Sequence, residues 1–193
     1  PAAHAAPTDT LVRWHEIMLQ ANADDHTPGV GVFQQGGPVR NSRAFAMTQL
    51  AVYDAVNSIT QQNKQYNPIG LAPAGASLDA AIACAAHGVL DVVYSSLQPD
   101  FDNALAADLA ALGAAQSVTD GCAIGEASAA AMIARRTGDG SELPDPAPGA
   151  GGVVATGTTN WFGEQVNGPE SDPALPRVTF RWSPDPIANQ PVA

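Results

Sequence analysis

Apolar residues recur at intervals of three and four positions in five segments of the chain, a spacing that predicts amphipathic α-helices. Each segment begins near a residue that commonly caps helices, and glycines and prolines separate the segments. The predicted helices cover about 9–23, 41–62, 77–97, 100–112 and 117–137. Their expected caps are Thr8 or Asp9, Asn41 or Ser42, Ser77, Asp100, and a capping box from Ser117 to Asp120, while Gly113 ends the fourth.

The connections between the third, fourth and fifth helices are short, so these helices are expected to pack as antiparallel neighbours. After Gly138 the helical period disappears and prolines and glycines become frequent, apart from a short strand expected at 178–182. Four aromatic residues lie in this region, and we interpret it as an extended arm that docks by them: Trp161, Phe162, Phe180 and Trp182. We therefore expect a helical bundle domain over residues 1–140 and an extended arm over residues 141–193.

Composition strengthens the prediction of an all-α bundle. Hydrophobic residues make up 45% of the 193 residues, which suits one globular domain with its own core. Only 6% of the residues are aromatic, so the core must consist mainly of Ala, Leu, Val and Ile. Helices rich in alanine approach each other closely, which favours a helical bundle.

The formal net charge of -11 makes nucleic acid and anionic membranes unfavourable partners, and no apolar run is long enough for a bilayer. The amino terminus contains Ala3-His4-Ala5, a small-x-small pattern typical of signal-peptidase cleavage, which predicts a secreted or periplasmic protein; an engineered start gives the same pattern. Cys84 and Cys122 are the only cysteines. They are either two buried thiols or, in an exported protein, a disulfide.

Asp54 is a carboxylate within the otherwise apolar second segment. Burying an ionised carboxylate costs several kcal/mol unless it is paired or hydrogen-bonded. Arg43 and Lys64 are the nearest cations in the sequence. We predict that Asp54 pairs with a cation or a helix end at a helix interface; a catalytic carboxylate is the alternative.

His15-Glu16, with His26 after Asp24-Asp25, contains the residue types of a metal site. Adjacent helical residues point in different directions, however, so His15 and Glu16 are poor co-ligands and solvated helix ends are favoured. The acidic residues are otherwise scattered, which is typical of a solvated surface.

His87 lies in the apolar third segment, where a hydrogen-bonded packing histidine is favoured over a proton-transfer role. The stretch 139–142, Asp-Gly-Ser-Glu, lacks the rest of a calcium-loop pattern, so a turn is favoured there. The sequence holds no nucleophile elbow, Walker loop, HExxH or CxxC motif. We therefore assign no catalytic, cofactor-binding or metal-binding residue in this chain.

Several stretches together resemble the amino-terminal half of bacterial vanadium-dependent haloperoxidase-like proteins, in the superfamily of type 2 phosphatidic acid phosphatases. They are Arg43-Ala44-x-Ala46-Met47, Tyr53-Asp54-Ala55-Val56-Asn57, Trp14, Ala81 through Ala86-His87-x-x-Leu90, Gly125-Glu126 through Arg136-x-x-Asp139-Gly140, and Trp182-x-Pro184-Asp185-Pro186. The resemblance implies an all-helical fold and, in the complete protein, peroxide-driven halide oxidation by bound vanadate.

The family's vanadate pocket uses a Lys followed by Arg-Pro, a Ser-Gly-His stretch, and a later Arg with a His. None of these motifs occurs here, and Lys64 is the only lysine, so the vanadate ligands are expected outside this chain. The resemblance thus implies a non-catalytic portion whose partner is the carboxy-terminal catalytic portion of the same protein, and it also allows a homodimer. An acid phosphatase of the same superfamily and a stand-alone helical binding module are the alternatives.

Overall fold

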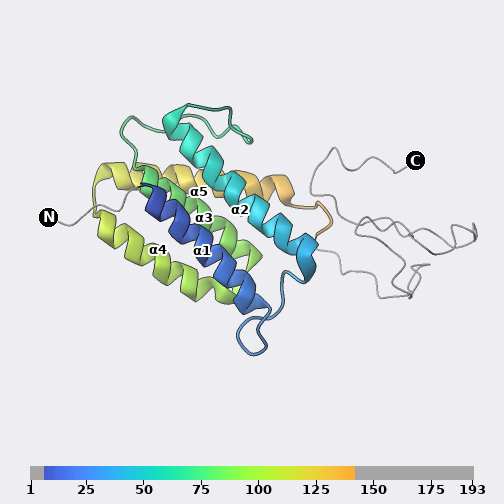
Figure 1. Ribbon diagram of the computed structural model, residues 1–193. Coiled ribbons are helices and arrows are strands. Elements are labelled where there is room, and N and C mark those ends of the chain that lie inside the picture. Colours follow the sequence, from blue (N-terminus) through green and yellow to red (C-terminus); the bar gives the residue numbers. More distant parts are fainter. Residues whose placement is uncertain (1–6, 142–193) are drawn as a thin grey trace, which may run out of the picture. The chain divides into compact units, whose positions relative to one another are not determined.

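The computed structural model describes residues 7–141, which form five α-helices and no β-strand. This architecture confirms the all-α bundle expected from the sequence (Figure 1). The arm, its four aromatic residues and the strand expected at 178–182 lie outside the described residues. The helices are α1 (Pro7–Asp25), α2 (Gly37–Thr60), α3 (Leu78–Val93), α4 (Gln98–Leu112) and α5 (Gln116–Arg136), with a short 3₁₀ helix, η1 (Ser95–Leu97), before α4.

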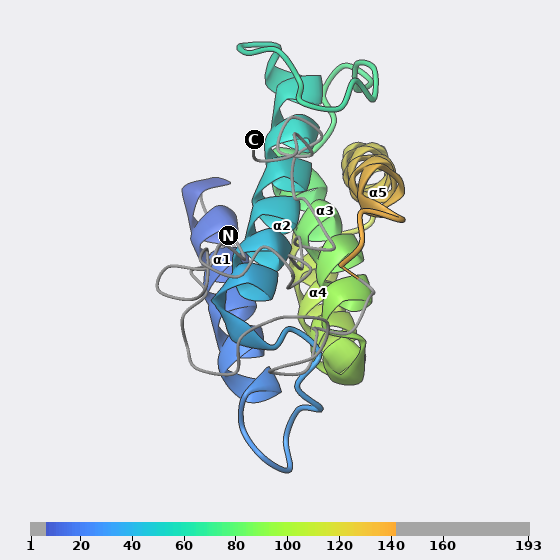
Figure 2. The ribbon, with the colours of Figure 1, turned by 90° about the vertical axis from the view of Figure 1, so that its right-hand side faces the viewer.

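Helix α3 is the centre of the bundle. It contacts α1, α2 and α4 (Figures 1 and 2). A disulfide joins it to α5. Its buried side chains are nearly all small or β-branched, as the low aromatic content predicts: Ala80, Ala81, Ile82, Ala83, Cys84, Ala85, Ala86, Val89, Leu90 and Val93. Because half of these side chains are single methyl groups, the neighbouring helices approach α3 closely. A few large residues fill the remaining core, notably Trp14, Met18, Tyr94, Phe101 and Met132.

The crossing of α3 and α5 brings backbone against backbone. A Cβ atom added at Gly125 would lie 2.5 Å from the carbonyl oxygen of Ala81 and 2.7 Å from the nitrogen of Ala85. Gly121, one turn earlier, faces the Ser77 carbonyl oxygen in the same way. Glycine is therefore required at both positions by the space available, since an alanine methyl group would overlap the α3 backbone.

A disulfide between Cys84 and Cys122 links α3 to α5 at this crossing, with the two Cα atoms 5.2 Å apart. The sequence left open whether these residues are thiols or a disulfide, and the structure has the disulfide. Cys84 is buried and the side chain of Cys122 is half-buried beside it.

Four predicted helix starts differ from the structure. Helix α1 begins at Pro7, so Thr8 and Asp9 lie in its first turn and neither is its cap. Helix α2 begins at Gly37, before the predicted Asn41 or Ser42, because proline is tolerated in the first helical turn, where its missing N–H has no partner to lose. Helix α4 begins at Gln98, so Asp100 lies within its first turn and is not its cap. Helix α5 begins at Gln116, so Ser117 lies inside the helix and is not its cap. The carbonyl oxygen of Ser117 accepts a hydrogen bond from Ser77 N.

Other predicted boundaries are confirmed or shifted slightly. The Ser77 side chain caps α3 by accepting a 3.2 Å hydrogen bond from Ala80 N. Gly113 ends α4 with φ of 86°, a conformation that glycine adopts without strain. Helix α3 ends at Val93, four residues before the predicted Leu97, because η1 intervenes before the chain turns into α4.

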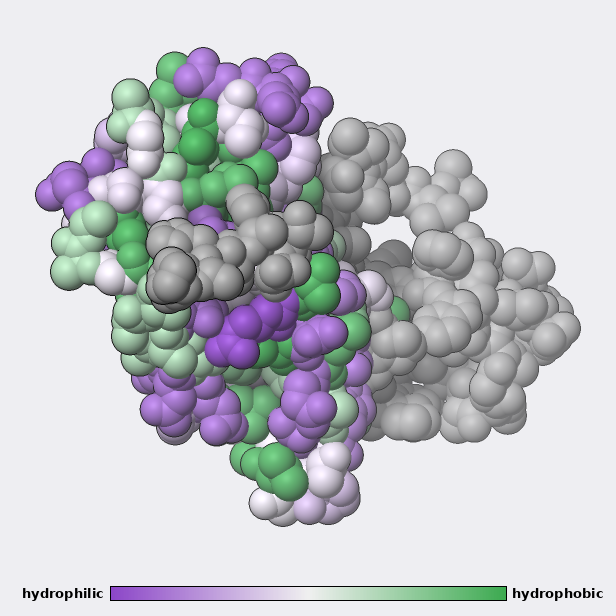
Figure 3. Space-filling model, turned by 60° about the vertical axis from the view of Figure 1, so that its left-hand side comes forward, coloured by the Kyte–Doolittle hydropathy of each residue, from purple (hydrophilic) through white to green (hydrophobic). Residues whose placement is uncertain are grey.

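Two loops leave opposite ends of α2 (Figures 1 and 2). The loop 26–36 connects α1 to α2, and the loop 61–77 connects α2 to α3. The first loop exposes three large apolar side chains, Val30, Val32 and Phe33. On the face drawn in Figure 3, hydrophobic and hydrophilic residues are otherwise intermixed.

No single described helix is long and apolar enough to cross a membrane. Helix α3 and the segment Ser95–Leu112 meet that criterion only together, and they are bent by 115° relative to each other.

Candidate functional site

One histidine and two aspartates gather where α3 meets α4. His87 and Asp91 lie one turn apart on α3, which places them on the same face of that helix, and Asp102 lies on α4. His87 Nε2 is 2.8 Å from Asp102 Oδ1. One nitrogen or oxygen atom from each of the three residues lies within 4.8 Å of the other two. Among residues 7–141, these are the side chains arranged to share a metal ion.

The carboxylate of Asp91 is the least satisfied member of this group. Its Oδ2 atom accepts a 2.9 Å hydrogen bond from Gln98 Nε2, at the start of α4. Its Oδ1 atom is buried and meets no hydrogen-bond donor among the described residues. Buried polar atoms are rarely left without a partner. Asp91 shares this property with Asn22 and Asp79, and it is the one of the three that belongs to the His–Asp–Asp group.

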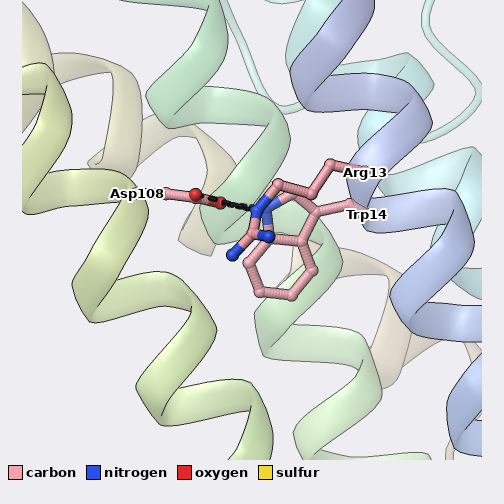
Figure 4. A network of polar contacts seen from close by, with 3 residues as sticks. All are labelled: Arg13, Trp14 and Asp108. Atoms are coloured by element: carbon pink, nitrogen blue, oxygen red, sulfur yellow. Dashed lines mark hydrogen bonds and ion pairs between the residues drawn. The ribbon is translucent and has the colours of Figure 1, made fainter.

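Trp14 of α1 packs against the histidine from inside the bundle. Its ring meets the His87 imidazole edge-on, with the ring centroids 6.4 Å apart and an angle of 85° between the planes. The indole Nε1 donates a 2.9 Å hydrogen bond to Asp108 Oδ2 on α4. Arg13 Nε donates to the same carboxylate, 2.9 Å from Oδ1, as Figure 4 shows. Asp108 therefore fixes the tryptophan ring, and the ring in turn limits the orientations of His87.

The prediction that His87 is a hydrogen-bonded packing histidine is confirmed. Its imidazole is half-buried, contacts the edge of Trp14 and bonds to Asp102. The sequence prediction missed both aspartates near it. The spacing of His87 and Asp91, four residues apart on a predicted helix, was the signal that could have found the pair.

Asp54 is fully buried, and its partners differ from those predicted. Its two carboxylate oxygens accept hydrogen bonds from the backbone N–H groups of Tyr66, at 2.5 Å, and Asn67, at 2.8 Å. The expected partner was a cation or a helix end; the observed partners are amides of the loop 61–77. Burial raises the pKa of the Asp54 carboxyl above its ordinary 3.8, and the two amide hydrogen bonds act in the opposite direction. Asp54 thus holds a loop onto the bundle.

Asp25 plays the same role at the other end of α2, and the sequence prediction missed it. We expected Asp24-Asp25 at a solvated helix end, but Asp25 is buried and accepts hydrogen bonds from Gln34 N at 2.7 Å and Gln35 N at 2.8 Å. Burial, and to a smaller extent the charge of Asp25, raises the pKa of the Tyr94 hydroxyl far above its ordinary range. Each of the two loops that flank α2 is therefore held by one buried aspartate.

The other candidate residues do not form a common site. His15 is exposed on α1, with its Nδ1 3.1 Å from Gln49 Nε2, and Glu16 beside it is exposed. His26 follows α1, where its Nδ1 is 2.8 Å from the Asn22 carbonyl oxygen. His26 thus lies at a helix end, as expected, whereas His15 and Glu16 lie in the middle of α1.

The turn predicted after α5 is confirmed for its described part. Asp139 Oδ1 accepts a 3.1 Å hydrogen bond from Ser141 N, which is a short side-chain turn. Glu142, the last residue of the predicted stretch, lies outside the described residues.

Two of the described cations contact side chains of other elements. Arg13 pairs with Asp108, and the guanidinium of Arg135 lies 4.7 Å from the centroid of the Tyr66 ring. Lys64 is exposed in the loop 61–77.

The fold and the groupings above define an all-α helical bundle with a His–Asp–Asp group at the α3–α4 junction. Comparison with protein-family models, with curated proteins and with solved structures finds no match to this chain.

Proposed function

We propose that the chain is the amino-terminal, non-catalytic helical portion of a vanadate-dependent haloperoxidase-like protein. The observation that carries the proposal is the place of the residues that resemble the family. Trp14, Asp54 and Gly125 are all framework residues: they hold α1 to α4, a loop to α2, and α5 to α3. The chain resembles the family at residues that hold the bundle together and lacks the residues of the vanadate pocket. This combination is expected of a supporting portion of such an enzyme.

In the proposed complete protein, this bundle packs against a carboxy-terminal catalytic portion and helps to shape the substrate entrance. The vanadate ligands are assigned to that catalytic portion, because this sequence has no Arg-Pro and no Ser-Gly-His. When bound, vanadate supplies a Lewis acid that activates peroxide toward halide. The residues described here contribute position and stability only.

The disulfide supports the export part of the proposal. Disulfides persist in oxidising environments and are rare in reducing cytosol. A bundle joined by Cys84–Cys122 is therefore suited to a secreted or periplasmic protein, in agreement with the small-residue pattern near its amino terminus.

The test compares the 193-residue chain with the product of the full reading frame. We expect the frame to continue past Ala193 into a Lys followed by Arg-Pro and then Ser-Gly-His. The longer product should brominate a dye when given vanadate, bromide and peroxide, and the 193-residue chain should not. Omission of vanadate from the longer product is the matched control.

Two outcomes would overturn the proposal. A reading frame that ends at Ala193 and yields a well-folded monomer would favour a stand-alone helical module. A longer product that hydrolyses a phosphate monoester but does not brominate with vanadate would make it a phosphatase of the same superfamily.

A further inference from the structure

The group at the α3–α4 junction has the composition of a metal site. It offers one imidazole nitrogen, from His87, and two carboxylates, from Asp91 and Asp102, all within 4.8 Å. We propose that these three residues bind one Zn²⁺ ion and that the ion joins α3 to α4. This site is independent of the haloperoxidase proposal, since its residues contribute nothing to an oxyanion pocket.

The donor set favours zinc over magnesium or calcium. Imidazole nitrogen suits zinc and other later transition metals, whereas magnesium and calcium prefer sites made of oxygen alone. Three protein ligands with water as the fourth is a common arrangement for zinc. The two carboxylates also place a double negative charge beside the imidazole, which a divalent cation balances.

The positions of the side chains require little rearrangement. Ligand atoms around zinc lie roughly 3.3 Å apart when each bond is about 2.0–2.2 Å long. His87 Nε2 and Asp102 Oδ1 are already 2.8 Å apart. The Asp102 side chain is 57% exposed, so it is free to rotate, while the Trp14 ring fixes one side of the His87 imidazole. The His87 ligand is therefore preorganised, and the Asp102 ligand can adjust its position.

A second observation is that Asp91 keeps an unused acceptor. Its Oδ2 atom is bonded to Gln98, whereas its Oδ1 atom is buried without a hydrogen-bond donor among the described residues. Asn22 and Asp79 each have one such oxygen as well, but of the three only Asp91 lies within 4.8 Å of a histidine nitrogen and a second carboxylate. Its carboxylate is therefore available to a cation shared with His87 and Asp102.

The experiment is calorimetric titration of chelator-treated, non-reduced protein with ZnCl₂ at pH 7. We expect one equivalent of Zn²⁺ to bind and to raise the melting temperature. Asp102→Asn should weaken binding by at least about tenfold, because it removes a ligand at an exposed position where folding is tolerant. Asp100→Asn is the matched control: it changes the same residue type in the first turn of the same helix and should leave the affinity unchanged.

A second control separates this site from surface histidines. Replacing His15 and His26 together by Gln should leave the one-equivalent binding intact, because both lie outside the group. Mg²⁺ and Ca²⁺ at millimolar concentration should not displace the zinc.

The proposal is wrong if the wild type binds no stoichiometric zinc, or if Asp100→Asn weakens binding as much as Asp102→Asn. It is also wrong if the double histidine variant loses the binding. Circular dichroism of each variant shows whether the bundle is folded, and an Asp91→Asn variant provides an independent test of the site if Asp102→Asn does not fold.

Discussion

Removing the Cys84–Cys122 disulfide should destabilise the bundle by about 4 kcal/mol. The bond closes a loop with a sequence separation of 38 residues. In the chain-entropy model, a loop of this length lowers the entropy of the unfolded state by an amount worth about 4 kcal/mol at 25 °C. For a bundle of this size, a loss of that magnitude should lower Tm by about 10–15 °C.

The perturbation is the double variant Cys84→Ala and Cys122→Ala. Alanine suits these positions because Cys84 is buried beside alanines, where serine would bring an unpaired hydroxyl into the core. The assay is urea denaturation followed by circular dichroism, with and without a thiol reductant. The reductant should remove most of the difference in free energy of unfolding between the wild type and the variant. The free energy of unfolding of the variant should not change with the reductant. The variant in reductant is the control for effects of the reductant itself.

Two results would refute this reasoning. If both thiols of the unfolded, non-reduced wild type react with an alkylating agent, the disulfide does not form. If the bond forms but its removal changes the free energy of unfolding by less than about 1 kcal/mol, loop closure is not what it contributes, and the denatured state must already be compact.

Three further predictions follow from single contacts. Gly125→Ala should cost about 2–3 kcal/mol in urea denaturation, because its methyl group would overlap the Ala81 carbonyl; a cost near zero would mean that α5 can move away. Folding raises the pKa of the Asp54 carboxyl above 3.8. Between the unfolded-state and folded-state pKa values, the folded protein therefore keeps the carboxyl proton that the unfolded chain has lost. The stability advantage of the wild type over Asp54→Asn should therefore shrink as the pH rises through that window, and an advantage that grows would contradict the burial argument. Trp14→Phe should cost about 2 kcal/mol in thermal unfolding by removing the bond to Asp108, and the Trp14→Phe, Asp108→Asn pair should then be non-additive.

The helices could be predicted from the sequence because their apolar positions repeat every three or four residues over 15 to 24 residues. Their starts were harder to predict, as α2 shows, because a proline that breaks a helix interior is tolerated in a first turn. The apolar neighbours of Asp54 indicated only that it either lies at the edge of the stripe or has a partner. The partners themselves could not be predicted, since they depend on how the chain folds back between residues 61 and 77.

Asp25 shows where reading one sequence is insufficient. It sits at the end of α1 beside Asp24, and that position is ordinary for a solvated acid. Only the path of the loop 26–36 brings two backbone amides to its carboxylate. The same holds for the His87–Asp102 contact, because residues 15 positions apart meet only once α4 has turned back along α3.

The alanine-rich α3 gives this bundle an unusual response to sequence change. In most cores, the damaging substitutions are truncations that leave cavities. Here Ala80, Ala81 and Ala85 have 0% exposure and only one methyl group each to lose, and freezing that methyl group costs no rotamer entropy. Larger side chains are the damaging substitutions here, because a single added methylene at these positions pushes a neighbouring helix away. Over many generations the chain should therefore tolerate drift in its loops and resist any increase in side-chain volume along α3.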